Sequence, residues 1–399
     1  MILKKIILRN FRNYEEQVID LNNRFNFIFG DNGHGKTNIL EAISFLTYGR
    51  SFIGAVENEC IKFGCDEFFI EGEFENDLEN TFTIRLVYNL STKKKAYFLN
   101  GDKVSGFSSE IFGRFPVVFL SPHSLNITYG NPSERRKFFD ILIAQTNKLY
   151  LDYLKMYSKI LKQKNALLKS NLANGNIAGS EFNDLLESYN EKMAEVSANI
   201  IFRRLKFLDE FKVFFQRNFS ELTPEDDNTH INYFTDFSGE ISNSGEMSPE
   251  SINIALSSEF RNRYNEEISR GISVVGPQRD DYIFRLEKRT GSGERKNFNL
   301  KSYGSQGEHK TFLVALKLAE YYYLMDRSGT CPVLLLDDVL SELDSGRISN
   351  IVSHLNNFGQ VMLTTTDRNY SEGINRFYDN DEITLFNIKE GMVHYDEKS

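Results

Sequence analysis

Gly30-Asp31-Asn32-Gly33-His34-Gly35-Lys36-Thr37 sets the architecture that we expect of this chain. The segment fits the pattern G-x-x-x-x-G-K-[ST], whose glycines allow backbone N–H groups to curve around a polyphosphate. The apolar residues 25–29 before it predict a strand, and the apolar spacing over residues 38–48 after it predicts a helix. The order strand, glycine loop, helix therefore favours a phosphate-binding loop over a plain glycine-rich turn with an exposed lysine.

The side chains of this loop predict ATP and Mg²⁺ as cofactors. Lys36 is expected to reach the β- and γ-phosphate oxygens, and the hydroxyl of Thr37 to ligate Mg²⁺. The helix that starts here adds its dipole to the anion site. The residues predicted to contact the nucleotide in this segment are Gly30, Asp31, Asn32, Gly33, His34, Gly35, Lys36, Thr37 and Asn38.

A second motif, Val333-Leu334-Leu335-Leu336-Asp337-Asp338, predicts the partner of the loop. A continuous apolar run is typical of a strand buried on both faces, and two acids at its end are costly unless they serve a metal or a water. We expect Asp337 to complete the Mg²⁺ shell, and Asp338 to orient the attacking water or accept its proton. Alone, the run also fits a strand followed by a turn, but its pairing with the loop favours the metal site.

The distance between the motifs predicts the domain organisation. Asp337 follows Lys36 by 337 − 36 = 301 residues, too many for a single crossover in a compact domain. A second lobe must therefore be inserted, and the helical pattern from residue 133 onward, which resembles a helical hairpin, fits it. We predict a discontinuous head of residues 1–130 and 266–399, and an inserted helical lobe of residues 131–265.

Two further segments suggest contacts to phosphate. In Tyr303-Gly304-Ser305-Gln306-Gly307, Ser305 and Gly307 precede a helical run and would present a hydroxyl and bare amides to an anion. One monomer has little use for a second phosphate site, so we expect it to serve another subunit's nucleotide; a capping serine beside a flexible glycine is the alternative. Thr366, after an apolar run, is expected to hold the water or sense the γ-phosphate, unless it only ends a strand.

Composition limits the remaining possibilities. The formal charge is 47 − 56 = −9, and 40% of the residues are hydrophobic, which argues against disorder. No run approaches the length of a membrane span, and the three cysteines lack the spacing of a disulfide scaffold or a zinc ribbon. We therefore expect a soluble, reduced, cytoplasmic protein without a membrane partner, whose nucleic-acid binding must come from local basic patches.

The order of these motifs resembles the ATP-binding-cassette (ABC) head of SMC/Rad50-like ATPases, and most closely the RecF family. Pro132-Ser133-Glu134-Arg135-Arg136 and Gly276-Pro277-Gln278-Arg279-Asp280-Asp281 are the segments most particular to that family. Further segments that carry the resemblance are Leu8 to Tyr14, Leu40 to Phe52, Ser121 to Leu125, Gln163 to Lys169, and Leu336 to Asp344 with its Ser341-Glu342-Leu343-Asp344. The resemblance covers nearly the whole chain.

The resemblance implies an α/β fold: an ABC-type P-loop ATPase head with an inserted, mainly helical lobe. It implies a homodimer that closes on ATP, with each nucleotide meeting Ser305 of the opposite subunit and with Arg12 and Gly307 among the nucleotide contacts. The residues expected to act in catalysis are Lys36, Asp338, Ser305 and Thr366. Hydrolysis is expected to be slow, stimulated by DNA and coupled to dissociation rather than to a metabolic reaction.

The resemblance also implies partners. The family binds single- and double-stranded DNA, favours junctions and gaps, and helps RecO and RecR to load the recombinase in recombinational repair and replication restart. Departures from the family pattern concern single residues. Glu308 replaces a glutamine of the signature, Asp338 is shorter than the usual glutamate, which suits slow turnover, and Thr366 replaces the switch histidine of transporters. His123 stands where a glutamine-loop residue is expected.

Two basic sets are candidates for DNA contacts. The first set is Arg50, Lys62, Lys93, Lys94 and Lys95. Within it, Arg50 and Lys93 to Lys95 are our first choice, because a hairpin edge near the P-loop helix would face the dimer groove. The second set, in the helical lobe, comprises Arg135, Arg136, Lys137, Lys155, Lys159, Lys162, Lys164, Lys169, Arg203, Arg204 and Lys206. A solvated surface is the alternative for each.

Three other functions compete with this hypothesis. A chromosome-organising SMC protein would need sustained heptads over hundreds of residues, which are absent. A transporter ATPase is disfavoured by the long separation of the two motifs and by the absent switch histidine. A nuclease with an SMC-like head would need a further domain, yet only 399 − 366 = 33 residues follow Thr366.

Overall fold

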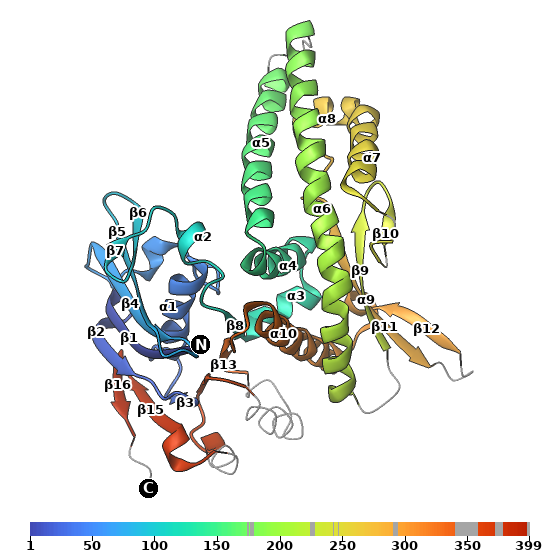
Figure 1. Ribbon diagram of the computed structural model, residues 1–399. Coiled ribbons are helices and arrows are strands. Elements are labelled where there is room, and N and C mark those ends of the chain that lie inside the picture. The colour runs from blue at the N-terminus through green and yellow to red at the C-terminus, as the bar shows by residue number, and fades with distance from the viewer. Residues whose placement is uncertain are drawn as a thin grey trace. The chain divides into compact units, whose positions relative to one another are not determined.

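The computed structural model describes residues 1–173, 175, 179–223, 228–241, 243–245, 247–289, 294–339, 358–371 and 378–396. Its contacts divide the chain into two compact units (Figure 1). The first unit combines Met1–Ser124 with Glu320–Ser399, and the second is Leu125–Ala319. The first unit is therefore discontinuous in sequence, and the second is inserted into it.

The C-terminal boundary of the inserted unit lies later in the sequence than we predicted. Residues 266–319, which we assigned to the head, belong to the second unit. The physical reason is strand pairing, because β11 (Asp281–Arg289) pairs antiparallel with β9 (Asn228–Thr235). This stretch is thereby bound to a strand of the inserted lobe, which contains a sheet as well as helices.

The first unit contains an antiparallel sheet. Its strands show the alternation of buried and half-exposed residues that is typical of a sheet with one face on the core, as in the segment from Phe68 to Phe74. In the order in which they pair, the described strands are β2 (Tyr14–Asp20), β1 (Ile2–Phe11), β4 (Glu67–Glu75), β5 (Thr81–Asn89), β6 (Lys94–Leu99) and β7 (Asp102–Lys103).

A second, mainly parallel sheet carries the site. In pairing order, its described strands are β16 (Met392–Tyr395), β15 (Ile383–Lys389), β3 (Phe25–Phe29), β14 (Val361–Thr365), β13 (Val333–Asp337) and β8 (Val117–Leu120). Every residue of β3, β8, β13 and β14 is buried, as expected of parallel strands covered on both faces. The strands predicted around residues 25–29 and 333–337 are confirmed.

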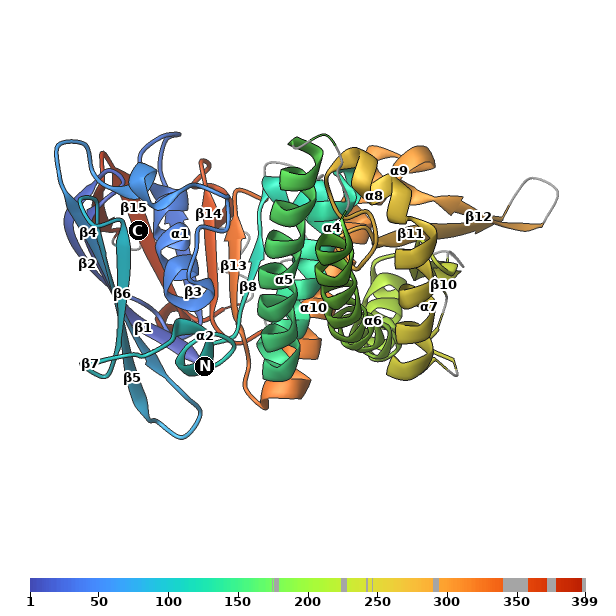
Figure 2. The same ribbon diagram turned by 90° about the horizontal axis from the view of Figure 1, so that it is seen from above.

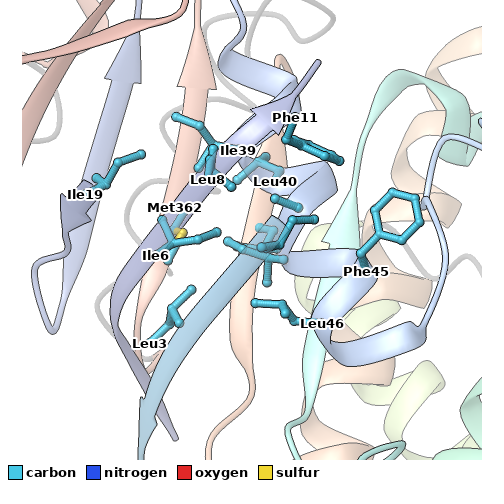
Figure 3. Packing of buried hydrophobic residues seen from close by; sticks show 14 of the residues in the cluster. Leu3, Ile6, Leu8, Phe11, Ile19, Ile39, Leu40, Phe45, Leu46 and Met362 are labelled. Atoms are coloured by element: carbon cyan, nitrogen blue, oxygen red, sulfur yellow. The ribbon is translucent and has the colours of Figure 1, made fainter. Parts of the chain in front are cut away.

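Helix α1 (Lys36–Tyr48) packs on both sheets of this unit. It begins after Gly35 (φ 114°) and ends at Gly49 (φ 72°), and both residues have the positive φ that favours glycine. Figure 3 shows Leu40 and Leu46 of α1 in one apolar cluster with Leu3 of β1 and Met362 of β14. The cluster fixes the helix on which Lys36 and Thr37 stand. The shorter elements of the unit are α2 (Phe107–Glu110), η1 (Glu57–Cys60), η2 (Pro122–Leu125) and η4 (Asn380–Glu382).

The second unit is mainly helical. Its described helices are α3 (Asn126–Tyr129), α4 (Pro132–Thr146), α5 (Lys148–Ala173), α6 (Ser180–Leu222), α7 (Pro249–Asn262), α8 (Tyr264–Arg270), α9 (Leu300–Tyr303) and α10 (Gln306–Ser328), which ends in the first unit. Its antiparallel strands pair in the order β10 (Gly239–Ile241), β9, β11, β12 (Arg295–Asn299). Helices α5 and α6 lie side by side (Figures 1 and 2), which confirms the predicted helical hairpin. No described helix is long and apolar enough to cross a membrane.

The two segments most particular to the RecF family meet inside the second unit. Arg135 of α4 donates from Nε and Nη2 to the carboxylate of Asp281, at 2.8 Å in both cases. Arg136 donates from Nη1 to the carbonyl oxygen of Asp280 at 2.6 Å. Arg204 of α6 is buried and donates from Nε and Nη2 to the two carboxylate oxygens of Asp140, each at 3.0 Å. These residues join α4, α6 and the start of β11, so their first role is structural.

Candidate nucleotide-binding site

The phosphate-binding loop lies between β3 and α1, where the sequence predicted it. Lys36 donates from Nζ to the carbonyl oxygens of Gly30 at 2.8 Å and Asp31 at 2.9 Å. These bonds hold the ammonium group within the curve of the loop. Gly35 has a φ of 114°, which favours glycine, and a Cβ here would also lie 2.7 Å from the side chain of Asn13. Asp31, Asn32 and Gly33 are exposed and accessible to a ligand.

Two residues that the sequence analysis did not single out support the loop from outside. Asn13 donates from Nδ2 to the carbonyl oxygen of His34 at 2.7 Å and accepts from Nδ2 of Asn38 at 2.8 Å. Tyr14 is buried and donates from its hydroxyl to the carbonyl oxygen of Gly35 at 3.0 Å. The turn that leads into β2 therefore fixes the loop. The only signal for these two residues was their place in the segment Leu8 to Tyr14.

Asp337 and Thr37, both predicted as metal ligands, meet in the structure. The hydroxyl of Thr37 donates to Oδ1 of Asp337 at 2.8 Å, and the hydroxyl of Thr364 donates to the same oxygen at 2.7 Å. Burial raises the pKa of Asp337, although the two hydroxyl donors act in the opposite direction. A hydroxyl and a carboxylate are the hard oxygen ligands that Mg²⁺ prefers, and the cation would favour the ionised carboxylate. The donor set therefore fits Mg²⁺ together with phosphate oxygens.

Asp338 follows β13 with a left-handed backbone. Its φ is 48°, which is uncommon for a residue other than glycine and occurs often at functional sites. Its backbone N–H donates to Oγ1 of Thr364 at 3.0 Å. Burial lowers the pKa of Lys36, and the carboxylates of Asp338 and Asp337 counteract this effect. The predicted acid is therefore placed in one electrostatic cluster with the predicted phosphate-binding lysine.

Thr364 is a further residue of this site that the sequence analysis did not single out. It lies opposite Asp337 in the parallel register of β13 and β14, is fully buried, and bonds to both Asp337 and Asp338. Thr366, which we predicted instead, is exposed beyond the end of β14. The two threonines have the same local pattern, and only the pairing of the strands distinguishes them. The predicted role of Thr366 at the γ-phosphate stays a prediction.

Replacing Thr364 by valine is expected to slow magnesium-dependent hydrolysis and leave nucleotide binding intact, because the loop is unchanged while the Asp337 carboxylate loses a donor. The free energy of unfolding should fall by about 1–3 kcal/mol, the range for leaving a buried polar group unsatisfied. Thermal unfolding and single-turnover hydrolysis measure the two effects. Thr366→Val is the matched control and should leave unfolding unchanged. A Thr364→Val protein with the stability and hydrolysis rate of the wild type would contradict the assigned role.

Arg12, a predicted nucleotide contact, has a protein partner. It donates from Nε and Nη2 to the two carboxylate oxygens of Glu41, both at 2.7 Å, and from Nη1 to the carbonyl oxygen of Glu59 at 3.0 Å. Glu41 is fully buried on α1 and also accepts from the hydroxyl of Ser51 at 2.6 Å. The hydrogen bonds from Arg12 to Glu41 raise the pKa of the guanidinium. Arg12 thus fixes α1 relative to β1, and its predicted contact with nucleotide stays a prediction.

Ser305 stands at the start of α10 in the second unit. Its backbone N–H donates to Oε2 of Glu308 at 2.7 Å, and its hydroxyl accepts from the backbone N–H of Glu308 at 3.3 Å, which is a capping box. Glu308 also pairs with Lys288. Burial opposes ionisation, but the ion pair and the bonds from Ser305 hold the pKa of Glu308 below its usual value. Ser305 therefore caps α10, as the alternative interpretation of this segment expected. Ser305 is exposed, and Gly307 is half-buried.

The five residues of the first basic set differ in their partners. Lys95 donates from Nζ to the carbonyl oxygen of Gly49 at 2.7 Å and to Glu57 at 2.6 Å, so it joins β6 to the end of α1. Lys62 pairs with Glu15 at 2.9 Å. Arg50, Lys93 and Lys94 are exposed. The structure thus places Lys95 beside the segment that carries Arg50, and the predicted DNA contacts of the set stay predictions.

Two segments that carry the resemblance to the family have no assigned contact in the described site. Ser341-Glu342-Leu343-Asp344 lies outside the described residues. His123 is exposed in η2, and its predicted place in a glutamine loop stays a prediction.

The chain is similar to known proteins over nearly its full length. Residues 2–383 match the family described as the RecF/RecN/SMC N terminal domain. The DNA replication and repair protein RecF of Chloroherpeton thalassium is 34% identical over 370 residues, which cover 92% of this chain and 95% of the relative.

Solved structures are similar as well. The structure of "the recombination mediator protein RecF-ATP in RecFOR pathway" matches with a TM-score of 0.86 and 31% identity, covering 99% of this chain and 98% of that one. An SMC head bound to the C-terminal winged helix domain of ScpA matches with a TM-score of 0.54 and 14% identity, covering 99% and 97%. The second likeness concerns the fold alone: that of an ABC-type ATPase head.

Proposed function

The chain belongs to the RecF family, and we propose that it is an ATP-gated DNA-binding dimer that acts in recombinational repair and replication restart. One observation carries the proposal. Thr37 and Asp337 are 300 positions apart in the sequence, yet their side chains are hydrogen-bonded beside Lys36. A phosphate-binding loop, a hydroxyl and a carboxylate at the end of a buried parallel strand form the arrangement that binds a magnesium nucleotide.

In the proposed site, different residues of the first unit bind the phosphates, hold the metal and activate the water. The loop amides and the Lys36 ammonium bind the phosphates, and Thr37 and Asp337 would hold Mg²⁺, which supplies positive charge at the β- and γ-oxygens. Asp338 orients the attacking water and accepts its proton. Its short side chain suits slow turnover, so ATP acts mainly as a regulatory ligand and its hydrolysis reopens the dimer.

The second unit supplies what the proposed dimer needs. Ser305 is exposed at the N-terminus of α10 and can offer its hydroxyl and the Gly307 amide to the γ-phosphate of a partner subunit. Lys288 neutralises Glu308, so the residue that departs from the usual signature glutamine does not present an unscreened charge there. A RecF structure with 31% identity to this chain was solved with ATP, which supports nucleotide-dependent closure here.

The likeness to RecF also supports the proposed partners. DNA at junctions and gaps is the substrate, and RecR- and RecO-type mediators are the protein partners, since the similar structure is assigned to the RecFOR pathway. We propose that the protein acts in the cytoplasm. A chromosome organiser with long arms is disfavoured because α6, with 43 residues, spans only about 65 Å.

The mass of the protein in solution tests the proposal. Light scattering should give the mass of one chain without nucleotide and of two chains with saturating ATP and magnesium. Fluorescence anisotropy with a labelled gapped duplex should then show tighter DNA binding in the presence of ATP than in its absence. A single-chain mass at saturating ATP and magnesium would overturn the dimer, and a lack of DNA binding under every nucleotide condition would overturn the assigned substrate.

A further inference from the structure

Helix α5 carries an unusual stretch of charge. Residues 153–173 contain five lysines and neither aspartate nor glutamate, although the chain as a whole has 56 acidic and 47 basic residues. The structure separates these lysines into two classes. Lys164 is fully buried and pairs with Glu267 of α8 at 2.6 Å. The other four are Lys155, Lys159, Lys162 and Lys169, and all four are exposed.

The four exposed lysines form one stripe. Their spacings of four, three and seven residues place them within roughly 80° of one another around a helix that turns about 100° per residue. The buried side chains of α5, which include Tyr157, Ile160 and Leu168, lie on the opposite face of the helix. The stripe therefore points away from the core of the second unit. We call Lys155, Lys159, Lys162 and Lys169 the α5 lysine stripe.

Among the residues that the structure describes, the stripe has almost no ion-pair partner. Lys155 lies 3.6 Å from Asp152, an exposed pair that contributes little. Within the part of the chain that the structure describes, Lys159, Lys162 and Lys169 form no ion pair. The neighbouring helix α6 carries exposed acids, among them Asp184, Glu187 and Glu191, and within the described residues none of these three pairs with a lysine of the stripe. The hairpin of α5 and α6 therefore carries the exposed stripe on one helix and these exposed acids on the other, without an ion pair between them.

We infer that the α5 lysine stripe is a binding site for the phosphate backbone of duplex DNA. The four charges span 14 residues, about 21 Å along the helix, which matches about six base pairs of a duplex. Between Lys155 and Lys169 the helix has no acidic residue, and the small Ala166 lies on the same face between Lys162 and Lys169. Lysines on a straight helix neutralise phosphates without reading bases, so the contact is sequence-independent and weakens with salt.

This site deepens the proposed function and rests on it, since it assumes that the protein binds DNA. It differs from the first basic set, because it lies in the second unit and its only ion pair among the described residues is the exposed one between Lys155 and Asp152. It also separates the helical-lobe lysines that face solvent from Lys164, which the sequence had grouped with them.

The test compares three charge variants of the full chain. The first replaces Lys159, Lys162 and Lys169 by glutamine, and the second does the same to the scattered exposed Lys103, Lys192 and Lys296, with an equal change in net charge. Binding of a labelled 30-base-pair duplex is measured by anisotropy at several potassium chloride concentrations, with ATP and magnesium fixed. The stripe variant should bind roughly 100-fold more weakly at 0.1 M salt, with a slope of log affinity against log salt that is flatter by about 2.7. The scattered variant should stay within about threefold of the wild type.

A third variant, Asp184→Asn with Glu187→Gln and Glu191→Gln, distinguishes DNA from a second copy of the chain as the occupant. DNA binding by this variant should equal that of the wild type, because the three replaced acids lie on α6 and would not contact phosphates bound along α5. If it loses as much affinity as the stripe variant, the stripe acts through contacts between copies and the inference is overturned. If wild-type protein binds the duplex and the stripe variant keeps its affinity and slope, the site is wrong while the proposed function stands. If the wild type binds no DNA, both the site and the proposed function are wrong.

Discussion

A Lys36→Met protein is expected to fold normally and to lose nucleotide binding by at least roughly 100-fold, or about 3 kcal/mol. The ammonium group lies within the curve of the loop, 2.8 Å from the carbonyl oxygen of Gly30, where the phosphates are expected. Methionine has a similar length but supplies neither charge nor donors, and charge-assisted hydrogen bonds contribute about 1.5–3 kcal/mol each. Isothermal titration with ATP and magnesium measures the loss, and light scattering should show that dimerisation disappears with it.

Stability provides the internal check on this variant. Burial lowers the pKa of Lys36, so the protein tolerates this charge rather than depending on it, and thermal unfolding should change little. Lys103→Met, on an exposed strand of the first sheet, removes the same charge and should bind ATP as the wild type does. If Lys36→Met retained affinity within about threefold, the loop would be the plain glycine-rich turn that we set aside.

The parts of the site that are local in sequence could be predicted from it. The glycine positions at residues 30, 33 and 35 and the continuous apolar run before Asp337 are patterns of adjacent residues, and the structure places them as expected. The contact between Thr37 and Asp337 followed because the two motifs belong to one chemistry. We predicted this contact because a magnesium site needs both a hydroxyl and a carboxylate, and hydrophobic periodicity contributed nothing to it.

The parts that depend on pairing between distant segments could not be predicted. Thr364 bonds to Asp337 only because β14 lies beside β13 in a particular register, and nothing near Thr364 distinguishes it from Thr366. The second boundary of the inserted unit depends on the pairing of β11 with β9, which joins residues on both sides of a long helical segment. The pairing of Arg12 with the buried Glu41 could not be predicted either, because Glu41 lies on another element.

For the lysines of α5, the helical spacing of the sequence already indicates which side chains are buried, but our sequence analysis did not use it. Lys164 falls at the helical spacing of Tyr157, Ile160 and Leu168, which indicates a buried position, whereas Lys159 and Lys162 fall between those apolar residues. Grouping lysines by their place in the chain hid this difference. The face of the helix, rather than the number of charges, decides which lysines can meet a ligand.

A Ser305→Arg protein is expected to bind ATP normally and to remain a single chain when saturated with it. The loop that binds nucleotide belongs to the first unit and Ser305 belongs to the second, so affinity should stay within about threefold. In the proposed dimer, the serine hydroxyl meets the partner's γ-phosphate, and a long side chain there would occupy the space of the phosphate. Light scattering at saturating ATP and magnesium, with DNA binding as a second readout, measures the loss.

The capping box at Ser305 makes a matched control necessary. Replacing the serine also removes a helix cap, which costs about 1 kcal/mol and could weaken any property that depends on stability. Ser248 caps α7 in the same unit through a similar box with Ser251, so Ser248→Arg should lose a comparable amount of stability and still dimerise. If the two arginine variants unfold alike and both dimerise with ATP, Ser305 only caps a helix. If only Ser305→Arg fails to dimerise, its hydroxyl serves the nucleotide of the partner, because loss of the cap is common to both.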